Sequence, residues 1–169
     1  MIIVVNDANV LIDLVKLQLL PHFFSLQFKF YTTDLILNEL HSWQVQELQM
    51  YINNGTLIVI QLNDTELIDI SLLQAEKRQL FIQDCSSIVC ARKVYGDLLT
   101  SDNNLRKFAI KKSLTVYGHL WIFDRMVETL IITPNFAIEK LTELREVINP
   151  RLNLPKIECE NRIELWKLL

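Results

Sequence analysis

Apolar, β-branched runs alternate along the chain with longer segments whose apolar residues recur every three or four positions. The first pattern is typical of buried strands, and the second is typical of helices that bury one face. Strands are predicted at residues 2–6, 29–33, 57–61, 97–101 and 114–118. Helical spacing joins Val10, Leu14 and Leu17, then Ile36, Leu40 and Trp43, and then Leu105, Phe108 and Ala109. The alternation predicts an α/β fold, in which helices cover both faces of a central, mostly parallel sheet of about five strands.

Polar residues mark where the helices are expected to begin. The predicted N-caps are Asn9, Thr33 or Asp34, Asp64, Asp84, and Asp102 or Asn103. Pro134 fits the first turn of a further helix that reaches about residue 147. Two prolines and an amphipathic stretch then follow, so residues 149–169 are predicted to form an arm and a short helix appended to a domain at 1–148.

Composition favours one compact, soluble domain. The chain has 169 residues and is 50% hydrophobic, which is enough for a substantial core without disulfides or metals. Its three cysteines, Cys85, Cys90 and Cys159, are an odd number without zinc-ligand spacing, which favours buried thiols in a reducing compartment. The N-terminus lacks the basic leader of a signal peptide, and no apolar run approaches the roughly 20 residues of a membrane span. We therefore expect a cytoplasmic protein.

Four acidic residues fall where such a sheet is expected to bind ligands. Asp7 and Asp102 follow the first and fourth predicted strands, and an open α/β sheet binds its ligands outside the carboxyl ends of the strands. Glu39 is expected just over one turn into the helix after the second strand, and Asp84 is expected to open a helix of its own. The inward stripe of that helix is predicted to continue through Ile88, Ala91 and Tyr95. The four carboxylates can therefore converge at one edge of the sheet.

A cluster of carboxylates has a chemical purpose. Several of them cannot share a small site unless protonation or a cation relieves their repulsion, and hard oxygen ligands favour Mg²⁺ or Mn²⁺ over zinc. A divalent ion held there can bind phosphate oxygens and activate water for the hydrolysis of a phosphodiester. Each acid alone also has a simpler interpretation, because Asp7, Asp84 and Asp102 fit helix caps or Asx turns and Glu39 fits a solvated helix face.

The net charge of −3 seems to argue against a nucleic-acid partner, because affinity for phosphates comes mainly from basic surface. Without the four acids, however, the charge of the remaining chain becomes +1. Bound cations would also reverse the local potential at the site. Net charge therefore does not exclude a nucleic-acid substrate.

Taken together, these motifs resemble the PIN domain, particularly the VapC-like toxin ribonucleases of bacterial and archaeal toxin–antitoxin systems. The opening VVNDANVLIDL at residues 4–14 is similar to the family's first motif, and it supplies Asp7, Asn9 and Asp13. The sequence ILNEL is similar to the second motif and supplies Glu39. The order of elements fits from residue 2 to about residue 147.

The segment at residues 80–109 carries the most specific part of the resemblance. It is similar to the third and fourth motifs, with Asp84 at the opening of a helix and Asp102 in a Thr-x-Asp turn. Thr100 corresponds to the family's threonine, whose hydroxyl is expected to order the turn or a neighbouring acid. His119 departs from the family, which often has a small hydroxyl residue there. This histidine can either reach substrate or cover the sheet edge, and we favour the structural interpretation.

The resemblance implies a three-layer α/β/α sandwich and a metal-dependent endoribonuclease. Asp7, Glu39, Asp84 and Asp102 would be the catalytic, Mg²⁺- or Mn²⁺-binding residues, while Asn9, Asp13 and Thr100 would support them. The implied partners are an RNA substrate, a small antitoxin protein and a second copy of the chain in a homodimer. From the residues alone, Asp13 can instead form a surface pair with Lys16, three positions away on the first helix.

Basic and aromatic residues suggest further contacts with RNA. Arg106, Lys107 and Lys111 follow the proposed site on one helix and can bind phosphates, or they can form an ordinary solvated face. The tryptophans Trp43, Trp121 and Trp166 can stack on bases, although we favour packing for them.

Two competing functions follow from the same residues. One is a catalytically inactive PIN-fold scaffold that acts through partner contacts, and the presence of all four acids argues against it. The other is a haloacid-dehalogenase-type phosphatase. That chemistry requires a second aspartate two residues after the first, and here the position is Asn9.

Overall fold

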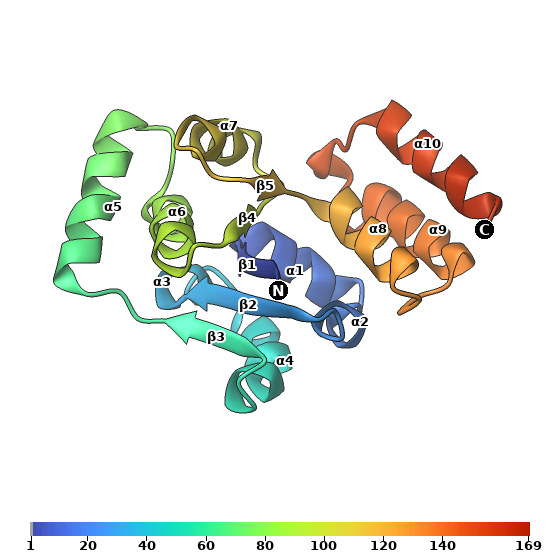
Figure 1. Ribbon diagram of the computed structural model, residues 1–169, viewed down its shortest axis with the longest axis horizontal. Coiled ribbons are helices and arrows are strands. Elements are labelled where there is room, and N and C mark those ends of the chain that lie inside the picture. The colour runs from blue at the N-terminus through green and yellow to red at the C-terminus, as the bar shows by residue number, and fades with distance from the viewer. Residues whose placement is uncertain (1) are drawn as a thin grey trace. The chain divides into compact units, whose positions relative to one another are not determined.

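The computed structural model describes residues 2–169 (Figure 1), which fall into two compact units. The first, which we call the sheet unit, comprises the chain up to Ile12 together with Gln27–Gly118. The second, the helical unit, comprises Asp13–Leu26 and His119–Leu169. The helix α1, at Ala8–Lys16, begins in the sheet unit and ends in the helical unit.

A five-stranded parallel sheet forms the centre of the sheet unit. Its strands are β1 (Ile2–Asn6), β2 (Phe28–Thr33), β3 (Leu57–Ile60), β4 (Asp97–Leu99) and β5 (Val116–Tyr117). They pair in the order β3-β2-β1-β4-β5, so the strand order reverses on the two sides of β1. The helices of this unit are α3 (Asp34–Leu37), α4 (Ser42–Asn53), α5 (Asp64–Glu76), α6 (Ile82–Val94) and α7 (Asn103–Lys111). The predicted α/β fold is confirmed, and it is consistent with a three-layer sandwich.

The largest helix contacts with the sheet come from α6, which packs on β1, β2 and β4 and also lies against α3 and α5. Val5 and Leu98 are register partners on the neighbouring strands β1 and β4, and both are fully buried beside Ile88 and Ala91 of α6. Apolar side chains of α5 and α7 close the same core. The inward stripe predicted for α6 ends before Tyr95, however. That residue has a left-handed φ of 53° at the helix end and is 94% exposed.

The helical unit contains no strand among its described residues. It comprises α2 (Leu20–Phe24), α8 (His119–Glu128), α9 (Pro134–Glu143), a π-helix (Leu144–Ile148), a 3₁₀ turn (Pro150–Leu152) and α10 (Lys156–Lys167). Pro134 begins α9, as predicted. Trp166 of α10 is buried and packs on Phe123, which confirms packing for that tryptophan. The domain boundary proposed after residue 148 remains a prediction.

Several helix starts differ by one to three residues from the predictions. Thr33 and Asp102 are N-caps, as expected. Asn63, rather than Asp64, caps α5. The helix α1 begins at Ala8, which places Asn9 inside it rather than at its cap. Asp84 is the third residue of α6 and reaches back to the N–H of Phe81, because a carboxylate in the first turn can satisfy a free backbone donor there.

The helix predicted to contain Ile36, Leu40 and Trp43 is interrupted. The first helical segment, α3, ends at Leu37, and α4 begins only at Ser42. The side chain of Gln44 accepts a hydrogen bond from the N–H of His41 at 2.9 Å and so starts a new helix. Trp43 is 49% exposed as a result, so it does not pack in the core, and its packing in an interface remains a prediction.

The three cysteines have the surroundings that the sequence predicts. Cys85, Cys90 and Cys159 are buried and unbridged. Burial raises the pKa of Cys90 to about 12, which suppresses its thiolate form. Between residues 2 and 169, no helix has the length and apolarity that a membrane span requires.

Replacing Ile88 by alanine tests the core that positions α6. The side chain is fully buried against the sheet, so the change should lower the free energy of unfolding by about 2–4 kcal/mol. Chemical denaturation of the two proteins would measure this loss. The matched control is Ile68→Ala on α5, where the side chain is 61% exposed and the expected change is within about 0.5 kcal/mol. Equal effects at the two positions would contradict the described core.

Candidate active site

Asp7 lies immediately beyond the carboxyl end of β1 and is almost completely buried, with 1% of its surface exposed. Its backbone N–H continues the sheet by donating to the carbonyl oxygen of Leu99 at 3.0 Å. Its Oδ1 accepts the N–H of Ala8 at 2.8 Å, and its Oδ2 accepts the hydroxyl of Thr100 at 2.7 Å. One bond of the backbone and two of the carboxylate therefore fix Asp7 at the carboxyl edge of the sheet, at the end of its central strand.

The Thr100 hydroxyl joins Asp7 to a second acid. While it donates to Asp7, its oxygen accepts the backbone N–H of Asp102 at 3.1 Å. Asp102 in turn caps α7, because its Oδ1 accepts the N–H of Leu105 at 2.7 Å. The single buried hydroxyl thus orders both the turn after β4 and the carboxylate after β1.

The packing of α6 against the sheet positions Asp84. The hydroxyls of Ser86 on α6 and Thr33 at the end of β2 share a hydrogen bond of 2.8 Å, so the first turns of α6 lie beside the carboxyl end of β2. Asp84 is half-buried, and its Oδ2 accepts the N–H of Phe81 at 2.8 Å. Its carboxylate therefore faces the same sheet edge from the start of a helix.

Glu39 lies in a turn rather than on a helix, which corrects the predicted placement. Its N–H bonds to the carbonyl oxygen of Ile36 at 3.1 Å, and the residue is exposed between α3 and α4. The sequence suggested a continuous helix because Ile36 and Leu40 are apolar residues four positions apart. Glu39 is consequently the least constrained of the four acids.

The four acids interact electrostatically. Burial, followed by the repulsion of Asp84 and Glu39, raises the pKa of Asp7 to about 7, although the bonds from Thr100 and Ala8 oppose the shift. Burial and the charge of Asp84 raise the pKa of Glu39. Burial and the charge of Asp102 raise the pKa of Asp84. Within the described residues, no cation is among the causes of these three shifts.

The donor set suits a hard divalent cation, since it consists of carboxylate oxygens that repel one another. The side chains are not gathered around one point, because no group of three or more His, Cys, Asp or Glu among residues 2–169 has a metal-holding arrangement. The bonds to Asp7 and Asp84 leave lone pairs on their carboxylates. Side-chain movements, including that of the exposed Glu39, would be needed to close the carboxylates on an ion.

Residues 3–159, which carry this geometry, match the family model of the PIN domain. The chain belongs to the PIN-domain family. PIN domains are generally nucleases and typically use divalent metals, so the family supports a nuclease-type function for this chain. A search of curated proteins found no match to the chain.

Asp13 of this PIN domain is buried in the helical unit, so the surface pair with Lys16 was wrong. Its Oδ2 lies 3.1 Å from Nε2 of His119, and the amide of Asn149 donates to both of its oxygens at 3.0 and 3.2 Å. His119 is also buried, which agrees with a structural role. Spacing could not reveal this group, because 136 positions separate Asn149 from Asp13.

The other predicted side chains of the PIN domain differ in their surroundings. Asn9 is exposed on the first turn of α1, two residues after Asp7. Lys107 is exposed on α7, and Lys111 forms an ion pair with Glu76 at 3.7 Å. Both lysines remain accessible to a ligand.

Arg106 has a structural role that the sequence did not suggest. Its guanidinium donates to the carbonyl oxygens of Thr100, Val116 and Tyr117 at 2.9–3.2 Å, which ties α7 to β4 and β5. The guanidinium therefore has protein partners, and the phosphate contact of Arg106 remains a prediction. Gly118 provides a signal in retrospect, since a Cβ there would lie 2.7 Å from Nη2 of Arg106.

Replacing Asp7 by asparagine should stabilise the PIN domain at high pH. Because its folded-state pKa is raised, the protonated carboxyl contributes stability that is fully present below about pH 4 and is lost as the pH rises through about 7. Asparagine does not titrate. Its advantage in free energy of unfolding should therefore grow between pH 4 and pH 8, by roughly 3–4 kcal/mol at most.

Denaturation of both proteins across this pH range, with chelator present to remove metal, would measure the difference. An advantage that does not change with pH would contradict the raised pKa of Asp7.

Proposed function

We propose that this PIN domain is a divalent-metal-dependent endoribonuclease that hydrolyses RNA phosphodiester bonds, with Asp7, Glu39, Asp84 and Asp102 as its catalytic acids. The Thr100 hydroxyl is the observation that carries this proposal. It holds the carboxylate of Asp7 and the backbone of Asp102 together at the carboxyl edge, although 93 positions separate Asp7 from Thr100. Helix capping explains Asp102 by itself but not a buried acid held beside it.

The proposed role of each acid follows from its position and burial. Asp7 is buried and fixed, so it would supply a ligand oxygen in a fixed position, while Asp84 and Asp102 would approach from the starts of two helices. When bound, Mg²⁺ or Mn²⁺ would hold the phosphate oxygens, lower the pKa of a water molecule and stabilise the leaving oxygen. The exposed Glu39 has the freedom either to complete the ligand set or to orient and deprotonate the attacking water.

Asn9 and Asp13 would support these acids through α1. Both lie on the helix that begins directly after Asp7, and the partners of Asp13, namely His119 and Asn149, fix the later turns of that helix. The amide of Asn9 is exposed on the first turn, where it can contact substrate or water.

The biological role that we propose is that of a cytoplasmic, VapC-like toxin, held inactive by a small antitoxin protein and assembled as a homodimer. Exposed apolar side chains of the C-terminal segment, including Ile157, Leu165 and Leu168, are compatible with such contacts. The alternative is a scaffold of the same fold without catalysis.

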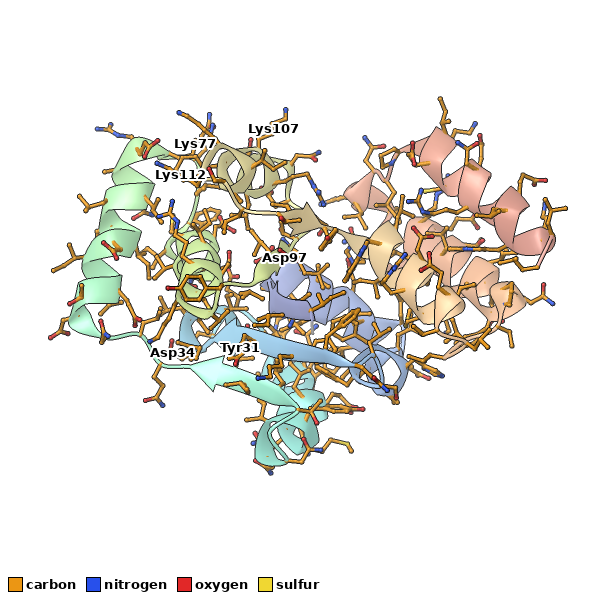
Figure 2. The ribbon with its side chains drawn as sticks, viewed as in Figure 1. Tyr31, Asp34, Lys77, Asp97, Lys107 and Lys112 are labelled. Atoms are coloured by element: carbon orange, nitrogen blue, oxygen red, sulfur yellow. The ribbon has the colours of Figure 1, made fainter. Side chains whose placement is uncertain are left out.

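Asp7→Asn should abolish metal-dependent cleavage of RNA. The charge of the buried ligand is removed, so cleavage of a mixed RNA pool with Mn²⁺ should fall by at least about two orders of magnitude, which exceeds the 10- to 100-fold cost of outer-shell changes. The matched control is Asp97→Asn. Asp97 is a partly buried aspartate with a raised pKa at the opposite end of β4 (Figure 2), and its replacement should leave cleavage unchanged.

Equal cleavage by the Asp7 variant, or cleavage that survives a chelator, would exclude the proposed mechanism. If neither the variant nor the wild-type protein cleaves RNA after any co-purified inhibitor has been removed, the scaffold function is favoured instead.

Thr100→Val should lower the cleavage rate by roughly 10- to 100-fold, because it removes both the hydrogen bond to Asp7 and the acceptor for the N–H of Asp102. Thr100→Ser keeps the hydroxyl and should restore most of the rate. Rates measured over a series of Mn²⁺ concentrations would separate weaker metal binding from slower chemistry. A serine variant as slow as the valine variant would argue against the role of the hydroxyl.

A further inference from the structure

An exposed aromatic ring lies beside the candidate acids. Phe81 is 70% exposed, and its backbone N–H bonds to the carboxylate of Asp84. The ring has no role in starting α6, because the contact that caps this helix is made by the backbone of Phe81 and not by its side chain. The ring is therefore free to contact a ligand bound at the acids.

Cations occur on the sheet unit in the connection that precedes Phe81 and on the helix α7. Lys77 and Arg78 lie four and three residues before Phe81, in the connection between α5 and α6, and Lys107 and Lys111 project from α7. A hollow of about 180 Å³ is lined by Lys77, Lys107 and Lys111, together with Glu76 and Phe108. Figure 2 shows Lys77, Lys107 and Lys112 grouped over α5 and α7. We call Lys77, Arg78, Lys107, Lys111 and Lys112 the basic strip.

The charge of the basic strip is only partly neutralised. Glu76 pairs with Lys112 and, at 3.7 Å, with Lys111. Over the described part of the chain, no ion pair involves Lys77, Arg78 or Lys107. Moreover, no acidic residue occurs between Asp102 and Asp124 in the sequence. Five cations and one anion therefore form a positive surface on a chain whose net charge is −3.

The basic strip leads away from the acids along α7. Asp102 caps this helix, and Lys107 and Lys111 follow on one face about 7 and 13 Å along its axis, at a rise of 1.5 Å per residue. Phosphate groups are bound by such ammonium ions without any requirement for base identity. A polyanion that passes the acids would therefore continue onto the strip.

We propose that Phe81 and the basic strip bind single-stranded nucleic acid, with one unpaired base stacked on Phe81 and the adjoining sugar-phosphate backbone on the lysines and Arg78. This inference rests on the proposed function, since it supplies the substrate of the same acids. An aromatic ring beside a basic groove is the combination that binds unpaired strands with little sequence preference. A duplex keeps its bases stacked and cannot offer one to Phe81.

Binding in the presence of chelator tests the proposal without cleavage. Fluorescence anisotropy with labelled single-stranded RNA, single-stranded DNA and duplex RNA should show tighter binding of the single strands. Phe81→Ala should raise the Kd for single-stranded RNA roughly tenfold or more, and Phe81→Trp should restore binding. The matched control is Tyr95→Ala at the other end of α6, where an aromatic side chain is even more exposed.

The charge of the basic strip is tested separately with Lys107→Glu. Binding should weaken, and the slope of log Kd against log salt concentration should fall by about 0.7 for each phosphate that the protein no longer neutralises. Lys29→Glu makes the same charge change on an exposed residue of β2 and should leave both quantities unchanged. Thermal melts of all variants would establish that they are folded.

The outcomes distinguish this inference from the proposed function. If Phe81→Ala binds like the wild-type protein, if duplex RNA binds as tightly as the single strand, or if the basic strip binds anionic lipid vesicles but not RNA, the inference is overturned. Wild-type protein that binds single strands as expected but never cleaves them with Mn²⁺ would instead disprove only the proposed function. Equal affinity for single-stranded DNA would support the inference and widen the class of substrate.

Discussion

The burial of one carboxylate constrains the rest of the site. Asp7 stands at the end of the central strand, where its N–H continues the sheet and its two oxygens are bonded to Ala8 and Thr100. A carboxylate in this position is desolvated, and Asp84 and Glu39 add repulsion. The fold maintains this buried carboxylate because the apolar surface that the parallel strands and α6 bury stabilises the fold by more than the desolvation of one charge costs. A stabilising core therefore holds in place a group that is unstable by itself, as is common at functional sites.

The sequence predicted the sheet and most of the proposed site because those features depend on local patterns. Buried strands leave β-branched runs, and acids that follow strands must lie at the carboxyl edge whatever the details of packing. The placement of Glu39 failed because it depended on Leu40 continuing a helix, whereas the bond between His41 and Gln44 starts a new one. A single side-chain contact therefore divides into two helices a segment that apolar spacing predicts as one.

Long-range partners explain the remaining differences. Arg106 was predicted on a charged face, but its guanidinium satisfies carbonyl oxygens at the ends of β4 and β5. Asp13 was three positions from a lysine, yet it bonds to Asn149 and lies beside His119. In both cases a charged side chain bonds to polar groups elsewhere in the sequence, and hydrogen bonds to such partly buried groups contribute more than a surface ion pair. Residue spacing cannot show which distant group needs a partner.

The distribution of charge on the sheet unit also resolves the apparent conflict between an acidic chain and a nucleic-acid substrate. The candidate acids are confined to the sheet edge, where mutual repulsion makes a cation favourable, while α7 changes from the acid at its cap to lysines within about three turns. A substrate phosphate would be attracted to the positive surface of the basic strip, which follows the candidate acid Asp102 along α7. In the proposed function, the basic strip would attract the nucleic acid and the neighbouring acids would carry out the hydrolysis. These two regions have opposite charge, so the net charge of the chain describes neither of them.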